Sequence, residues 1–219
     1  VGDANASLYA SGSYECGAVK ITLGTGAFVD VNTGNQPHAS IEGMIPICGW
    51  RLGSEYTYCG TGFAYSTGTV IEWAKSIGLI DSPSRCDEIV SSVQDSNGVF
   101  FVPSFAGLQA PVNDDDSGAL LIGMTAATSR AHLVRALLAG IVFRIFQVFL
   151  VIKKDREFLL PGIRCDGGMA QSDWICQRLA DLTGHTVERM AEKDSSCFGA
   201  ALLGGLAISK SLLLLCSAT

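Results

Sequence analysis

Short runs of alternating apolar and polar residues occupy the first part of the chain. Such alternation places every second side chain on one face, which predicts half-buried strands. The runs with this pattern cover residues 19–23, 27–31, 45–51 and 56–59. A Gly-Thr-Gly sequence separates the first two runs, so we expect them to form a β-hairpin. Residues 4–11, before the hairpin, read as a short helix with Asp3 as its N-cap.

Helix-compatible stretches and strand-like runs alternate along the rest of the chain. We predict helices over residues 66–77, 83–93, 128–151, 171–183 and 196–208. We predict buried strands over 98–103 and 163–166, and a short strand position at Val187. Residues 105–116, rich in Gly, Pro and Asp, form a long loop of the kind that is often functional. A meander followed by alternating helices and strands predicts an α/β domain with a mixed sheet and flanking helices.

The composition indicates a chain that packs well and does not bind nucleic acid. Of its 219 residues, 48% are apolar and 16% are charged, and the formal net charge is −6. It has no basic run that would contact the phosphates of a nucleic acid. The most apolar stretch, 133–152, carries Arg135, Arg144 and Gln147, so we expect a helix buried in protein and no membrane span.

The eight cysteines are scattered singly and form no CxxC pair, which argues against a zinc site. Several of them lie in apolar runs, where Cys behaves as a small core residue, and scattered thiols fit a reducing, cytoplasmic location. The chain opens on Val1 without a basic-then-apolar leader, so we expect a fragment that lacks a signal peptide. The adjacent carboxylates of Asp114, Asp115 and Asp116 are of a type that holds Mg²⁺ through water, but we favour a solvated turn.

Two glycine-containing turns are candidate binding elements, because each one follows an apolar strand. The first glycine turn consists of Gly24, Thr25 and Gly26, and the second consists of Gly167 and Gly168. Glycine lets a backbone approach a phosphate or nucleoside closely, and consecutive amides in such turns make concavities for anions. One such turn alone is equally an ordinary hairpin turn. Two of them suggest the two faces of one nucleotide site.

Seven short segments, in their order and spacing, carry a resemblance to a known family. They are Gly2-Asp3, Gly24-Thr25-Gly26-Ala27-Phe28, Asn32-Thr33-Gly34, residues 101–111, residues 132–136, Asp166-Gly167-Gly168 and Gly199-Ala200-Ala201. The chain resembles the carboxyl-terminal half of the FGGY family of sugar and polyol kinases, and within it the glycerol kinases. The resemblance covers residues 2–208 and leaves 209–219 as a divergent tail. It implies an actin-like ATPase fold of the ribonuclease-H type, with ATP, Mg²⁺ and substrate held between two domains.

The resemblance also implies nucleotide contacts. Thr25 of the first glycine turn would face the β- and γ-phosphates, and the second glycine turn would receive the adenosine. Gly68, Glu72 and Ser172 complete the implied nucleotide-binding set. Glu72 stands where glycerol kinases usually have Gln, and a carboxylate sits less favourably near phosphate. Ser172 stands where the family commonly has Asn, so its contact would be weaker.

For the substrate side, the resemblance implies that Asp3 is the catalytic base, which accepts the proton of the attacking hydroxyl. A helix N-cap role for Asp3 is compatible with that. Phe28 matches an apolar wall of the polyol pocket, and plain core packing is the alternative. Ala4 follows Asp3 where glycerol kinases have Gln, and Ala cannot hydrogen-bond a substrate hydroxyl. An unpaired buried hydroxyl costs about 1–3 kcal/mol, which puts glycerol itself in doubt.

The leading hypothesis is therefore the carboxyl-terminal half of an ATP-dependent polyol kinase that converts glycerol and ATP to glycerol 3-phosphate and ADP. Two alternatives stay open: a kinase for another polyol or ketose, and a non-catalytic nucleotide-binding remnant. The implied partners are a small-molecule polyol, an amino-terminal kinase domain outside this sequence, and identical subunits of a possible homo-oligomer. Without that first domain, we expect the chain to be inactive by itself.

Overall fold

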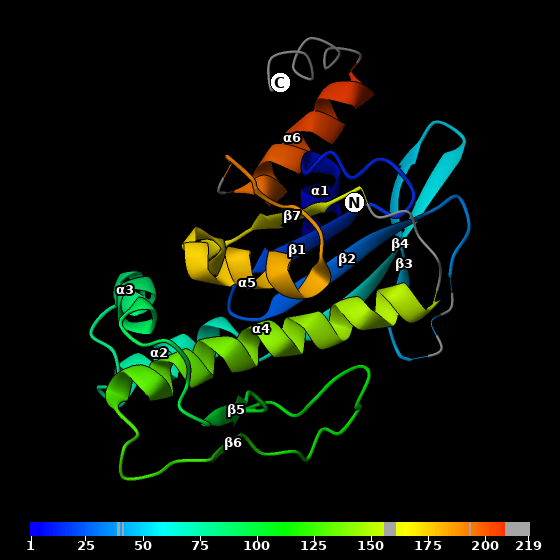
Figure 1. Cartoon of the computed structure of the whole chain (residues 1–219). Helices are drawn as coiled ribbons and strands as arrows, with labels where there is room; N and C mark the ends of the chain where they lie inside the picture. Colours follow the sequence, from blue (N-terminus) through cyan, green and yellow to red (C-terminus); the bar gives the residue numbers. More distant parts are fainter. Residues whose placement is uncertain (39, 41, 156–160, 193, 209–219) are drawn as a thin grey trace.

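A mixed sheet of six strands forms the centre of the protein (Figure 1). The computed structural model describes residues 1–38, 40, 42–155, 161–192 and 194–208. The strand order across the sheet is β3-β4-β2-β1-β7-β8. These strands are β1 (Val19–Leu23), β2 (Ala27–Gly34), β3 (Ile45–Leu52), β4 (Glu55–Ala64), β7 (Ile163–Asp166) and β8 (Val187–Arg189). Strands β1 to β4 pair antiparallel, whereas β7 pairs parallel to both β1 and β8, so the predicted mixed sheet is confirmed.

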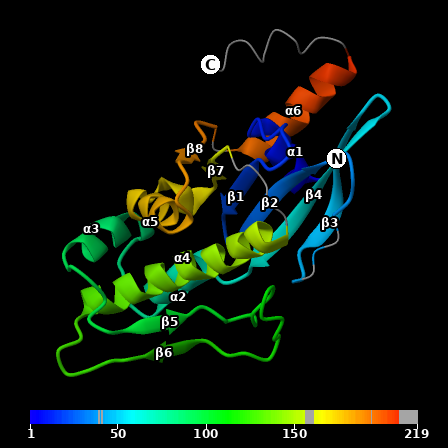
Figure 2. The same cartoon turned by 45° about the vertical axis from the view of Figure 1, so that its right-hand side comes forward.

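Helices cover both faces of the sheet. They are α1 (Asp3–Ala10), α2 (Gly68–Ser76), α3 (Cys86–Ser91), α4 (Arg130–Asp155), α5 (Asp173–Thr183) and α6 (Ser195–Ala207), with short 3-10 helices η1 (Pro83–Arg85) and η2 (Gly168–Gln171). Helices α1 and α6 pack together on one side, while α4 crosses the other (Figures 1 and 2). Each face therefore has its own apolar cluster. Leu8, Trp50 and Leu202 belong to the cluster under α1 and α6.

Alternation along β1 explains how one strand serves two different environments. Its residues Val19, Ile21 and Leu23 point toward α4 and belong to the main apolar core. Lys20 and Thr22 point to the opposite face, since successive side chains of a strand alternate. That face therefore carries polar groups inside the protein, and Lys20 itself is fully buried.

The long helix α4 packs inside the fold, as its internal charges predict. By length and composition it could cross a membrane, but 67% of its apolar window is buried in this domain. The Arg144 guanidinium donates to the Phe63 carbonyl of β4 at 3.3 Å. The Arg135 guanidinium donates to the carbonyls of Val90, within α3, and of Val93, just beyond it, at 2.6 and 2.9 Å. Both arginines are thus used as links between elements.

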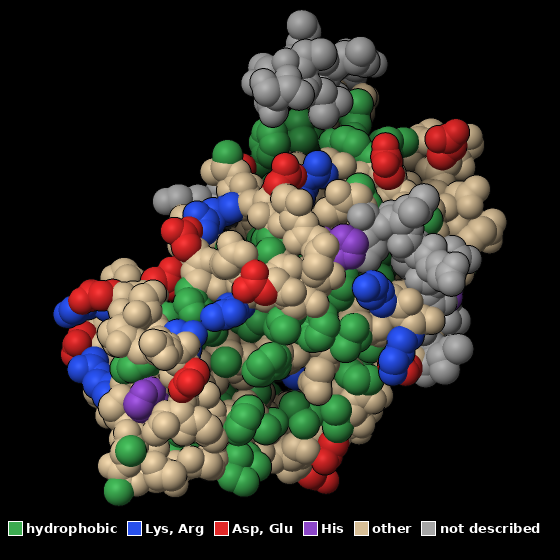
Figure 3. Space-filling view, in the orientation of Figure 1, with side chains coloured by type: hydrophobic (Ala, Val, Ile, Leu, Met, Phe, Trp, Pro, Cys, Tyr) green, Lys and Arg blue, Asp and Glu red, His purple; other side chains and the backbone are tan. Residues whose placement is uncertain are grey.

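Two short strands form a separate ribbon over α4. Strand β5 (Phe100–Val102) pairs antiparallel with β6 (Leu120–Ile122). The sequence prediction of a buried strand over 98–103 is therefore wrong in part, because Phe100 is 61% exposed and β5 lies outside the main sheet. Strand β6 was not predicted at all. Apolar side chains gather on this side of the molecule, over the ribbon and α4 (Figure 3).

The structure also corrects several helix starts. The N-cap of α1 is Gly2, with extended backbone, whereas Asp3 is already helical. Among the described residues, the Asp3 carboxylate accepts only from the adjacent Ala4 amide, at 2.8 Å, so the predicted N-cap role is wrong. Helix α2 starts at Gly68 within the predicted range 66–77, and Ser172 caps α5. The tail 209–219 lies outside the described residues.

Candidate functional site

The two glycine turns lie next to each other, as the sequence suggested. Strands β1 and β7 are parallel neighbours in register, with Thr22 paired to Asp166, so both turns follow at the same edge of the sheet. Gly167 has a φ of +93°, and a Cβ atom there would lie 2.5 Å from the Leu23 carbonyl oxygen. No other residue fits this contact without a shift of the backbone. Gly167 thus holds the two turns together.

The start of α2 anchors the first glycine turn. The Thr67 hydroxyl donates to the carbonyls of Gly24 and Thr25 at 3.1 and 3.2 Å. The Gly68 amide also donates to the Gly24 carbonyl, and a Cβ atom on Gly68 would lie 2.5 Å from that oxygen. The carbonyls of Gly24 and Thr25 are therefore directed at the start of α2, whereas the Gly26 carbonyl accepts from the Gly24 amide. Among the residues placed in the structure, none accepts from the amides of Thr25 and Gly26, which leaves two donors for an anion.

A cleft of about 740 Å³ opens beside these elements. This volume lies within the range of sites that bind small molecules and cofactors. It is lined by six residues of the predicted nucleotide-binding set, namely Gly24, Thr25, Gly68, Glu72, Gly168 and Ser172. Gly26 and Gly167 of the same set do not line it, and neither do Asp3 and Phe28. The tertiary fold therefore brings together residues that are far apart in the sequence.

The lining of the cleft also contains residues that the sequence did not reveal. Leu138 of α4 and Ile175 of α5 give it apolar surface, with Met169 beside the second glycine turn. In the sequence they read as ordinary core positions. Asp87 of α3 also lines the cleft, and nothing in its local sequence marks it. The arrangement offers apolar walls for a flat base and backbone amides for phosphates.

Ser172 is already occupied by contacts within the protein. Its hydroxyl accepts from the Ile175 amide at 3.1 Å as the N-cap of α5, and it donates to the Asp87 carboxylate. The other Asp87 carboxylate oxygen accepts from the Trp174 amide at 3.3 Å. The single hydroxyl hydrogen of Ser172 is therefore not free for a ligand. Glu72 is exposed on α2, one helical turn after Gly68.

Asp3 and Phe28 lie on the other side of the first glycine turn. Phe28 pairs with Thr22 across the hairpin, so it shares the sheet face that α1 covers. Its ring packs edge-on against Phe63, with ring centroids 5.2 Å apart. Asp3, at the start of α1, is exposed. The pocket-wall role of Phe28 and the catalytic role of Asp3 stay predictions.

The acidic loop forms a turn, as favoured from the sequence. The Asp114 carboxylate accepts from the Asp116 amide at 3.0 Å and from the Ser117 hydroxyl at 2.6 Å. The Ser117 and Asp116 hydrogen bonds hold the pKa of Asp114 below its ordinary value. Within the described part of the chain, no group of three or more His, Cys, Asp or Glu side chains converges on a metal site.

The buried sheet face under α1 contains a carboxylate, that of Asp30. Its Oδ1 atom accepts from the Thr61 hydroxyl at 2.8 Å, and Oδ2 has no hydrogen-bond partner among the described residues. Burial raises the pKa of Asp30 to about 6 from an ordinary 3.8, against the hydrogen bond from Thr61 and the charge of Lys20. The folded state therefore holds this proton more tightly than the unfolded state. The free energy of unfolding should fall as the pH rises through this interval.

Asp30→Asn should remove this pH dependence, because Asn stays neutral. Between about pH 4.5 and about pH 7.5, the wild type should lose about 2 kcal/mol relative to the variant, because about 1 kcal/mol of the full effect is already lost by pH 4.5. The measurement is denaturant unfolding of the full-length protein at about pH 4.5 and about pH 7.5. Asp115→Asn, an exposed carboxylate in the acidic loop, is the control and should keep the wild-type pH dependence. Equal pH dependence in wild type and Asp30→Asn would contradict the prediction.

Comparison with solved structures defines the class of the fold. The glycerol kinase of Plasmodium falciparum, solved with ADP, superposes with a TM-score of 0.89 at 32% identity, over 95% of this chain and 42% of that one. A xylulose kinase from Lactobacillus acidophilus superposes with a TM-score of 0.80 at 20% identity, over 93% of this chain and 41% of that one. The domain thus has the actin-like ATPase fold of these kinase structures.

Sequence comparison then establishes the family. The profile of the carboxyl-terminal domain of the FGGY family of carbohydrate kinases matches residues 19–208, and the chain belongs to this family. "Glycerol kinase 5" of Danio rerio is 43% identical over 204 residues, which are 93% of this chain and 39% of that protein. The human "Glycerol kinase 5" is 39% identical over 208 residues, 95% of this chain and 39% of that protein. The chain thus spans less than half the length of these relatives.

Proposed function

We propose that the full-length protein is an ATP-dependent polyol kinase and that this chain supplies its nucleotide side. The observation that carries the proposal is the pair of glycine turns at one sheet edge, opening on a cleft of about 740 Å³. The names of the relatives, among them glycerol kinases and a sugar kinase, support the reaction class.

Each side of the first glycine turn has its own task in the proposed reaction. On the cleft side, the Thr25 amide donates to the terminal phosphates, with the free Gly26 amide next to it in the turn, and Gly168 gives the nucleoside room to approach. On the α1 side, Asp3 accepts the hydroxyl proton of the polyol as that oxygen attacks the γ-phosphate. Phe28 contributes an apolar wall. The amino-terminal domain would supply the remaining contacts.

Mg²⁺ fits this arrangement as an ion carried by the nucleotide. It prefers water and phosphate oxygens, with one or two carboxylates, over a cage made wholly of protein. The described residues contain no such cage, and Asp3 is an exposed carboxylate on the substrate side. When bound, the ion neutralises the charge that develops on the phosphates. The residues of this chain position the nucleotide and accept the proton.

Ala4 offers no hydrogen bond to a substrate hydroxyl, which weakens the case for glycerol as the polyol. We therefore propose glycerol first and a ketose or longer polyol second. The test is a coupled assay of ADP formation by the full-length protein with glycerol, xylulose, ribulose and erythritol. We expect turnover with at least one of them that is lost in Asp3→Asn.

The second candidate function is a nucleotide-binding protein without catalysis. The engaged Ser172 hydroxyl and the absent side-chain contact at Ala4 favour it. Calorimetry with ADP separates the two. Nucleotide binding without turnover on any of the four substrates would support this candidate and contradict the kinase.

A further inference from the structure

A charged pair is buried directly behind the two glycine turns. The Lys20 ammonium lies 2.9 Å from the Asp166 carboxylate, and the two side chains are 0% and 4% exposed. Lys20 also contacts the Thr22 hydroxyl on its own strand. Burying two charges is costly, and well-packed apolar residues often stabilise a fold equally well. Stability alone therefore gives a weak reason for this pair.

The pair links the strands that lead into the two turns. Lys20 lies on β1, ahead of the first glycine turn, and Asp166 is the last residue of β7, directly before the second. Charge attraction and the hydroxyl donors lower the pKa of Asp166, although its burial acts to raise it. The carboxylate is therefore ionised at neutral pH and accepts strongly from its neighbours.

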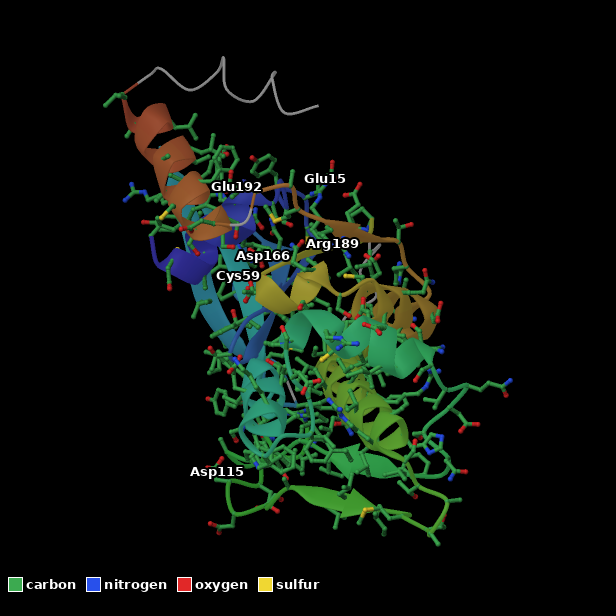
Figure 4. All side chains as sticks on the ribbon, turned by 90° about the vertical axis from the view of Figure 1, so that its left-hand side faces the viewer. Glu15, Cys59, Asp115, Asp166, Arg189 and Glu192 are labelled. Carbon is green, nitrogen blue, oxygen red and sulfur yellow. The ribbon has the colours of Figure 1, made fainter. Side chains whose placement is uncertain are left out.

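The same carboxylate also holds two helices. Its Oδ2 atom accepts from the Ser7 hydroxyl of α1 at 3.0 Å and from the Ser195 hydroxyl at the start of α6. In Figure 4, Asp166 lies inside the molecule close to these helices, far from Asp115 in the acidic loop. Ser7 is one helical turn after Asp3, so the two residues share a face of α1. Asp166 is thus connected to the helix that starts with Asp3.

We propose that Lys20, Asp166 and Ser7 are positioning residues that fix the start of α1, and with it Asp3, relative to both glycine turns. The inference rests on the proposed kinase function. Phosphoryl transfer depends mainly on positioning, and a misplacement of about 1 Å can cost about 10²-fold in rate. A hydrogen bond from Ser7 to a carboxylate that is tied to both turns removes the freedom of α1 to shift.

Two matched variants of the full-length protein test the network. Ser7→Ala removes the hydroxyl on α1, and Ser195→Ala removes the hydroxyl on α6, which carries none of the predicted site residues. Both variants take one donor from the same oxygen, and both also remove the contact between the Ser7 and Ser195 hydroxyls, so similar falls in Tm are expected. For Ser7→Ala we expect kcat to fall about 10- to 100-fold, with the Kd for ADP unchanged. For Ser195→Ala we expect kcat within about twofold of wild type.

The outcomes distinguish failure of the positioning role from failure of the proposed kinase function. An active wild type in which both serine variants lower kcat equally, in proportion to their Tm, would overturn the positioning role and leave the kinase intact. A rise in the Kd for ADP with unchanged kcat in Ser7→Ala would also overturn it. A wild type that turns over none of the substrates would overturn both proposals.

Discussion

Asp3→Asn in the full-length protein is expected to lower kcat by about 10²–10⁴-fold, the usual contribution of a general base. Asn keeps the size of the side chain but removes the charge and the ability to take a proton. The Asp3 carboxylate is exposed and does not cap α1, and in the described part of the chain it accepts only from the Ala4 amide. Its loss should therefore leave Tm unchanged. The Kd for ADP should also stay constant, because Asp3 does not line the nucleotide cleft.

Steady-state kinetics with the best substrate of the panel, together with ADP calorimetry, provide the measurement. Asp115→Asn, which neutralises an exposed carboxylate outside the predicted site, is the matched control and should behave as wild type. If Asp3→Asn keeps wild-type kcat, the catalytic assignment is wrong. If it loses Tm and kcat together, the carboxylate is structural.

Gly168→Val is expected to raise the Kd for ADP by about 100-fold, or roughly 2.7 kcal/mol, while the protein still folds. Gly168 lines the cleft, and a Cβ atom there would meet no protein atom within 4 Å. The added side chain would therefore fill space intended for the nucleoside. Gly168 has no positive φ, whereas Gly167 has a φ of +93°, so backbone strain restricts substitution at Gly167 and not at Gly168.

The neighbouring glycine and a distant one provide the controls. Gly167→Val should lower Tm, because its Cβ atom would collide with the Leu23 carbonyl. Gly118→Val also adds a side chain in open space, but in an exposed loop, and should change neither Tm nor the Kd for ADP. Calorimetry and thermal unfolding separate these effects. Unchanged ADP affinity in Gly168→Val would remove the second glycine turn from the nucleotide site.

The hairpin and its first glycine turn could be predicted from local sequence alone. Alternation over 19–23 and 27–31 specifies which side chains share a face, and the intervening glycines specify where the chain turns. The burial of helix α4 inside the protein could also be predicted, because Arg144 within this apolar helix requires a hydrogen-bond partner inside the protein. Short-range patterns determine such features, since the residues that decide them are neighbours in the chain.

Other features depended on residues far apart in the sequence. Strand β6 exists only because it pairs with β5, and three residues carry too weak a pattern to predict it. Asp87 reaches the cleft because α3 packs beside α4, and its hydrogen bond from Ser172 joins segments far apart in the chain.

The buried pair of Lys20 and Asp166 shows most clearly what local sequence determines and what tertiary packing determines. The sequence placed Lys20 at a polar position of a half-buried strand, which normally faces solvent. Only the tertiary structure covers that face with α1 and α6 and brings Asp166 within 2.9 Å of the ammonium. Alternation tells which face a side chain takes, but whether that face meets water or protein is decided by the packing of the whole chain.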